Sequence, residues 1–209
     1  MVRTSSTMLP LGTPLPPFEL ALVGGTGSGL IDQLDIDTTN SIASSIFISR
    51  PLLLMILCAH CPFVKHIEPE LTKIEKDYGN EIDILAVSSN SVITHPQDSP
   101  ENLALQALTN SWKFPYLWDQ DQTLAKALTA ACTPDFFVFA PDAMSIQKLQ
   151  YRGQLDESRP GNAAELTGKD LRLALDALLK GKEVITDQKP SIGCNIKWIP
   201  GMEPSWFRS

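Results

Sequence analysis

The chain has 209 residues, 43% of them hydrophobic, and a formal net charge of −7. This length and hydrophobic content are enough to bury one sizeable core, so we expect a single domain rather than two. The Lys and Arg residues are interspersed with Asp and Glu along the chain, whereas binding to a phosphate backbone needs a clustered basic face. We therefore expect no nucleic acid partner.

The beginning of the chain, residues 1–18, contains an arginine but no apolar run like that of a signal peptide, and prolines soon interrupt it. The longest apolar stretch, residues 51–59, is about half of the ~20 residues that a membrane-spanning helix needs. We expect a cytoplasmic location and no membrane span. Because structural disulfides are kept reduced in the cytosol, the four cysteines point to catalytic or metal chemistry.

The first half of the chain predicts an extended arm and then a sharply defined strand and helix. Residues 9–22 are rich in proline and end in a short strand, a turn follows at residues 24–29, and residues 31–49 predict a loop with one short strand near 46–48. Residues 52–57 are uninterruptedly apolar, which is typical of a strand covered on both faces. Residues 63–78 then carry apolar side chains at three- and four-residue steps, which predicts an amphipathic helix.

The second half predicts strands at residues 82–88, 114–118, 135–140 and 146–151, and helices at 101–112, 123–131 and 166–179. This order indicates an α/β fold with a central mixed sheet flanked by helices. We expect residues 1–183 to form this domain and residues 184–209 to form an irregular tail without helical or strand periodicity. Its aromatic residues Trp198, Trp206 and Phe207 would be unfavourable in water, so the tail should pack on the domain or on a partner.

The strongest chemical motif is Cys58-Ala59-His60-Cys61, between the apolar strand and the amphipathic helix. A thiolate near a helix N-terminus is stabilised by unpaired N–H groups and by the positive end of the helix dipole, which lowers its pKa. One turn also brings the second sulfur within bonding distance. We therefore predict a redox-active Cys58–Cys61 disulfide and no other cofactor, with Cys58 as the attacking thiol, Cys61 as the resolving thiol and His60 tuning the reduction potential.

A second motif, Cys132-Thr133-Pro134, directly precedes the strand predicted at 135–140. Proline reduces the preference for a trans peptide bond to about 0.5–1 kcal/mol. We predict a cis bond between Thr133 and Pro134 that presents the backbone of Thr133 to a bound partner chain.

Two further kinds of site have to be considered, namely a zinc site and additional redox thiols. Cys58, Cys61 and His66 have the spacing of zinc ligands, but His66 shares a helix with Cys61, which makes a tetrahedral set awkward, so we predict no metal site. Cys132 and Cys194 are candidates for additional redox thiols. Each can equally be a small buried hydrophobic residue.

The chain resembles the thioredoxin superfamily through residues 52–71 (LLLMILCAHCPFVKHIEPEL), the Thr-Pro strand entry, and the β-hairpin and helix that follow. More narrowly, it is similar to the peroxiredoxin-like redoxins of the alkyl hydroperoxide reductase/thiol-specific antioxidant (AhpC/TSA) group. The resemblance covers roughly residues 10–180 and implies a thioredoxin-like fold with an N-terminal extension. It also implies activity as a disulfide reductase, a disulfide oxidant or a peroxidase, with Cys58 and Cys61 as the redox pair and Thr133-Pro134 as the cis-proline site.

Two departures from the family pattern bear on the activity. A peroxidase of this group has Pro-x-x-x-Thr/Ser-x-x-Cys, and when its Cys is aligned with Cys61, Leu54 and Cys58 replace the Pro and the Thr. The apolar residues 52–56 also supply no buried acid, so proton transfer at Cys61 needs His60 or His66.

We therefore predict an antioxidant thiol–disulfide oxidoreductase that acts on protein or small thiol partners, with thioredoxin or glutathione as electron donor. A thiol peroxidase with a peroxidatic Cys61 and a non-catalytic binding or assembly protein are the alternatives.

Overall fold

A computed structural model of the chain describes residues 3–25 and 41–207. Its strands are β1 (Arg3–Ser5), β2 (Glu19–Gly24), β3 (Ser41–Ala43), β4 (Leu52–Ile56), β5 (Asp83–Ser88), β6 (Tyr116–Trp118), β7 (Cys132–Thr133), β8 (Asp135–Pro141), β9 (Gln147–Gly153) and β10 (Ile192–Asn195). The α-helices are α2 (Pro62–Tyr78), α3 (Pro100–Thr109), α4 (Thr123–Ala127) and α5 (Lys169–Leu179), and short 3-10 turns lie at η1 (Ser44–Ile46) and η2 (Pro96–Asp98).

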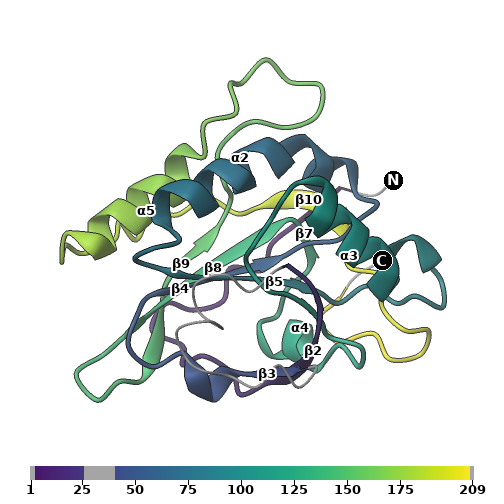
Figure 1. Cartoon of the computed structure of the whole chain (residues 1–209), viewed down its shortest axis with the longest axis horizontal. Coiled ribbons are helices and arrows are strands. Elements are labelled where there is room, and N and C mark those ends of the chain that lie inside the picture. The colour runs from purple at the N-terminus through teal and green to yellow at the C-terminus, as the bar shows by residue number, and fades with distance from the viewer. Residues whose placement is uncertain (1–2, 26–40, 208–209) are drawn as a thin grey trace.

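A seven-stranded mixed sheet in the order β3-β2-β6-β5-β4-β8-β9 forms the centre of the molecule (Figure 1). Strands β4, β5 and β6 run parallel to one another, and the outer strands on both sides pair antiparallel. Helices α2 and α5 lie side by side over one face of the sheet, and α4 lies on the other (Figure 1). The predicted α/β, thioredoxin-like fold is confirmed.

Strand β4 shows why an uninterrupted apolar run was needed at the centre of the sheet. Its residues alternate between two cores: Leu53 and Met55 pack against α2, α3 and α5, whereas Leu52, Leu54 and Ile56 pack against α4, the N-terminal arm and the C-terminal segment. Each of these side chains is 0–1% exposed. Burial of one such side chain contributes about 1.5–3 kcal/mol, so both faces of β4 fix the position of the residues that follow it.

The strand predicted near residues 46–48 is wrong. The strand lies earlier, at β3, and the chain then turns at η1, where the N–H of Phe47 donates to the carbonyl of Ser44 at 3.2 Å. Phe47 is buried against Phe18, while Ile48 is 56% exposed, so this short apolar run fills one pocket instead of extending a sheet. The turn predicted at residues 24–29 lies largely outside the described residues.

The prediction of an irregular tail is also wrong for part of residues 184–209. Strand β10 lies between β1 and β7 in a separate three-stranded antiparallel sheet. Its partners are far away in the sequence, so no local pattern could signal the pairing. After β10 the tail packs on the domain, where Trp198 is 5% exposed and meets the rings of Trp206 and Phe207 edge-on.

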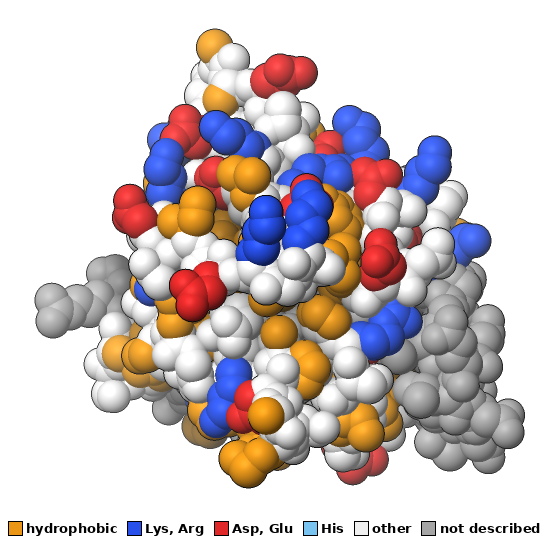
Figure 2. All heavy atoms as spheres, turned by 90° about the vertical axis from the view of Figure 1, so that its left-hand side faces the viewer, with side chains coloured by type: hydrophobic (Ala, Val, Ile, Leu, Met, Phe, Trp, Pro, Cys, Tyr) orange, Lys and Arg blue, Asp and Glu red, His pale blue; other side chains and the backbone are white. Residues whose placement is uncertain are grey.

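The surface near the end of α5 carries both signs of charge. Lys and Arg side chains alternate with Asp and Glu on this face, and small hydrophobic groups lie between them (Figure 2). Among the described residues, no helix is both long and apolar enough to span a bilayer.

Candidate active site

Three chain segments meet at one edge of the central sheet. The parallel strands β4 and β5 both end there, since Ile56 pairs with Val87, and the antiparallel strand β8 begins there, since Ile56 also pairs with Asp135. The C-x-x-C segment, the loop after β5 and the Thr133-Pro134 segment are therefore neighbours. The topology brings together residues that are up to 75 positions apart.

Cys58 and Cys61 both contact Thr133. The Sγ atom of Cys58 lies 3.3 Å from the Thr133 hydroxyl, and the Sγ atom of Cys61 lies 3.3 Å from the Thr133 carbonyl oxygen. Both cysteines are fully buried. Helix α2 begins at Pro62, so Cys61 is its N-cap residue and lies closer to the positive end of the helix dipole than Cys58 does.

The two thiols have opposite electrostatic environments. Burial, a hydrogen bond with Cys61 and the negative charge of Asp98 raise the pKa of Cys58 well above its ordinary value. Hydrogen bonds from Cys194 and Cys58 outweigh burial and hold the pKa of Cys61 well below its ordinary value. These contacts favour negative charge on Cys61 over Cys58, whereas the sequence led us to expect Cys58 as the attacking thiol. The helix dipole acts on the N-cap sulfur, and the earlier cysteine faces a carboxylate.

His60 is held by a buried carboxylate from the loop after β5. One Asp98 oxygen accepts hydrogen bonds from the N–H groups of Ala59 and His60 at 2.9 and 3.1 Å. The other lies 2.6 Å from His60 Nδ1 and accepts a bond from the Asn90 amide at 2.7 Å. Burial raises the pKa of Asp98, but the hydrogen bonds from His60 and Asn90 bring it below its ordinary value. Asp98 thus fixes both the C-x-x-C backbone and the His60 ring.

A second buried acid, Asp135, follows the proline directly. Burial raises its pKa to about 8, against weaker opposing hydrogen bonds from Ser191 and the N–H of Phe136. One of its carboxylate oxygens has no hydrogen-bond partner. Strand β8 thus carries a buried acid, whereas β4 carries none.

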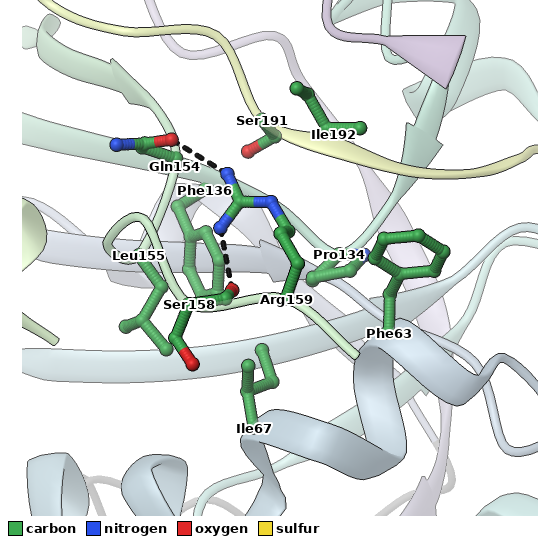
Figure 3. A pocket seen from close by; sticks show the side chains of 10 residues that line it. All are labelled: Phe63, Ile67, Pro134, Phe136, Gln154, Leu155, Ser158, Arg159, Ser191 and Ile192. Carbon is green, nitrogen blue, oxygen red and sulfur yellow. Dashed lines mark hydrogen bonds between the residues drawn. The ribbon is translucent and has the colours of Figure 1, made fainter. Parts of the chain in front are cut away.

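The bond between Thr133 and Pro134 is cis, as predicted. Beside it lies a shallow pocket whose apolar walls come from α2, β8 and the segment after β9 (Figure 3). Phe63, Pro134 and Leu155 line it, and Ile192 of the tail borders it. Arg159 reaches across one side, where it donates hydrogen bonds to Gln154 and to backbone carbonyls (Figure 3).

The two further cysteines lie close to the pair but differ in environment. The Sγ atom of Cys194 lies 2.7 Å from that of Cys61. Cys132 is buried, with its sulfur 3.8 Å from the carbonyl oxygen of Pro134, and burial together with the charge of Asp135 raises its pKa well above its ordinary value. The environment of Cys132 is that of a small buried residue, which is one of the two alternatives from the sequence. Cys194 is in contact with the redox pair.

The zinc set of Cys58, Cys61 and His66 does not form. His66 Nε2 lies 2.8 Å from the hydroxyl of Ser158 and is not among the grouped ligand atoms. In the described part of the chain, the metal-capable groups that do come together are Cys58, His60 and Asp98, within 4.8 Å of one another. Because both Asp98 oxygens already accept hydrogen bonds, a cation there would have to replace the contacts that hold the C-x-x-C segment.

Asp98 and Asn90 were not singled out from the sequence. The available signal was their position: Ser88-Ser89-Asn90 follows the carboxyl end of a buried parallel strand, where functional side chains gather in α/β sheets. His95, from the same loop, stacks on His60 with ring centroids 5.2 Å apart.

Comparison with known proteins identifies relatives that cover most of the chain. A model of the AhpC/TSA family matches residues 11–148. An uncharacterized conserved protein from Geobacillus kaustophilus has a solved structure that is 43% identical, with a TM-score of 0.84, 96% of this chain covered and 98% of that chain. A hypothetical protein from Sinorhizobium meliloti is 40% identical, with a TM-score of 0.82, 95% of this chain covered and 100% of that chain.

A more distant structure shares the fold alone. It is the peroxidoxin BcpB from Mycobacterium tuberculosis, which is 16% identical, with a TM-score of 0.55, 81% of this chain covered and 96% of that chain. No curated protein sequence matches this chain.

Proposed function

This chain belongs to the AhpC/TSA family of thiol-based redoxins, and we propose that within it the chain is a thiol–disulfide oxidoreductase that uses the pair Cys58 and Cys61. The observation that carries the proposal is the meeting of both sulfurs at Thr133, next to the N-terminus of α2. A thiolate attacks a disulfide most readily when its charge is stabilised and a second thiol stands ready to release the product.

In the proposed reaction, the Cys61 thiolate attacks one sulfur of a partner disulfide. The other partner sulfur leaves as a thiolate, and Cys58 then attacks the Cys61 sulfur to release the first. Cys58 must lose its proton for this step. The His60–Asp98 pair lies within 4.8 Å of its sulfur and is the group that we assign to accept this proton.

The partners that fit this chemistry are protein disulfides and small thiols. The shallow apolar surface formed by Phe63, Pro134 and Leu155 beside the cis bond is the surface to which we assign contact with an apolar side chain of the partner. Thioredoxin or glutathione would reduce the Cys58–Cys61 disulfide and return the site to its dithiol state.

Trapping of mixed disulfides tests these roles. A variant with both Cys58→Ser and Cys194→Ser should accumulate a mixed disulfide on Cys61 when it is mixed with an oxidised protein such as insulin, because neither thiol that contacts Cys61 remains, and Cys61→Ser should accumulate none. Both variants should lose insulin reduction, and Cys132→Ser is the control of equal burial that should retain it. If insulin reduction survives in both variants, the proposed function is wrong.

The environment of Cys61 favours a second candidate, a thiol peroxidase with Cys61 as the peroxidatic residue. A thiolate at a helix N-cap is also suited to attack hydrogen peroxide. Against this candidate, the residue three positions earlier is Cys58 in place of a hydroxyl residue. Rapid mixing with hydrogen peroxide separates the two: a sulfenic acid that forms on Cys61 much faster than on a free thiol in solution would favour the peroxidase.

A further inference from the structure

Strand β10 lies on the same backbone edge that was expected to receive a partner chain. It pairs antiparallel with β7, so that Cys194 is opposite Thr133 and Asn195 is opposite Cys132. The pairing is close, because a Cβ atom on Gly193 would lie 2.0 Å from the Thr133 carbonyl oxygen. An extended segment of the chain itself thus occupies the docking edge, as a peptide does when it adds a strand to a sheet.

The same strand delivers a thiol to the redox pair. Alternate residues of a strand face the same side, so Ile192 and Cys194 point together toward the site. Ile192 borders the pocket beside Pro134, and the Sγ atom of Cys194 lies 2.7 Å from that of Cys61, where a disulfide of about 2.05 Å needs only a small approach. Cys194 therefore stands where a substrate cysteine would stand.

The tail is tied to this position by buried polar side chains. Asn90 accepts a hydrogen bond from the N–H of Lys197 at 2.8 Å, and Gln122 donates to the Lys197 carbonyl and accepts from the N–H of Ile199, both at 2.8 Å. Asn90 is 4% exposed and Gln122 is fully buried. On the other side, β1 pairs with β10 along its length. The fold thus contains groups that recognise the backbone of this segment.

We propose that β10 is a built-in partner of the active site and that Cys194 forms an intramolecular disulfide with Cys61 during turnover. This inference rests on the thiol–disulfide exchange proposed above and adds a third thiol to it. An external partner chain can pair with β7 only when β10 leaves, so the site alternates between its own tail and an outside strand.

Formation of the Cys61–Cys194 disulfide needs no reactant other than the partner disulfide. Cys61 first attacks a partner disulfide, which forms a Cys61–partner bond and releases one partner thiolate. That thiolate takes the proton of Cys194, whose sulfur then attacks Cys61 and releases the second partner sulfur. The Cys61 thiolate and the Cys194 thiol are oxidised to one disulfide, and the two partner sulfurs are released as one thiol and one thiolate.

Peptide mapping of the full-length protein tests this pairing. The reduced protein is mixed with oxidised glutathione, quenched with acid, alkylated, and digested with trypsin. Cys58 and Cys61 stay on one peptide because no Lys or Arg separates them, whereas Cys194 lies on another, after Lys182. A Cys61–Cys194 bond therefore joins two peptides, and a Cys58–Cys61 bond closes a loop within one.

We expect the two-peptide link in the wild type, in Cys58→Ser and in Cys132→Ser, and its loss in Cys61→Ser. A Cys58–Cys61 loop with Cys194 fully alkylated would overturn this inference and leave the proposed function intact. A link that persists in Cys61→Ser would show that Cys194 pairs with Cys58 and would also overturn it. Absence of both disulfides would contradict the proposed function as well.

Discussion

Gly193 controls how tightly β10 lies on β7, and replacing it with Ala should loosen the strand. The added Cβ would lie 2.0 Å from the Thr133 carbonyl oxygen, 2.6 Å from its carbon and 3.2 Å from Pro134 Cδ. The two closest atoms are backbone atoms that cannot turn aside, so the strand itself must move. Forcing an additional carbon into a packed region costs about 1–3 kcal/mol.

This cost shifts the equilibrium between docked and released β10. Since about 1.4 kcal/mol corresponds to a tenfold change, the released fraction should rise roughly 5- to 150-fold. Cys194 is 2% exposed when docked, so its alkylation in the reduced native protein reports this fraction. Mass spectrometry of iodoacetamide labelling over time should show that Cys194 is labelled roughly 5- to 150-fold faster in Gly193→Ala than in the wild type.

Gly201→Ala is the matched control, because Gly201 is in the same tail and a Cβ there meets nothing within 4 Å. Its positive φ of 81° makes the substitution unfavourable locally, but it lies outside β10 and should leave the labelling of Cys194 unchanged. Labelling of Gly193→Ala at the wild-type rate would refute the assignment of Gly193 as the residue that permits the close pairing.

Three further predictions concern stability. Asp98 has a pKa below its ordinary value. Its contribution to the free energy of unfolding is therefore present above about pH 4 and is lost as the pH falls through that lower pKa. Urea unfolding should show that Asp98→Asn is about 2–3 kcal/mol less stable at pH 7, with less further loss in acid. Asp135 has a pKa raised to about 8, so the free energy of unfolding should fall as the pH rises from about 4 to 8, and Asp135→Asn should remove that slope in a denaturant series. Trp198→Ala should cost about 3–5 kcal/mol in thermal unfolding, because the buried ring packs against Trp206 and Phe207; a loss under 1 kcal/mol would show that the tail contributes little.

The elements nearest the redox pair were predictable because their sequence signals are local. Strand β4 is apolar at every position, and α2 carries its apolar side chains at helical spacing, so their junction at Cys58-Ala59-His60-Cys61 follows from the sequence. The cis bond before Pro134 was predictable from its place at the entry of a strand.

Features that depend on distant pairing were not predictable in this way. Strand β10 shows no strand pattern in its own sequence. Its two neighbours, β1 and β7, come from distant parts of the chain, so its pairing could not be predicted locally. The difference between the environments of the two thiols could not be predicted for a related reason. The spacing of Cys58 and Cys61 places both near the helix, but only the folded chain brings Asp98 toward one and Cys194 toward the other.

The side chain of Asn90 has one more consequence. Its amide nitrogen donates to Asp98 in the active site, and its oxygen accepts from Lys197 in the tail. A single rigid amide group therefore belongs to both contacts, so a change in one contact alters the free energy of the other. By thermodynamic reciprocity, the effect of the Asp98 contact on the binding of the tail equals the effect of the tail on that contact. The docking edge and the carboxylate that holds His60 thus share one side chain.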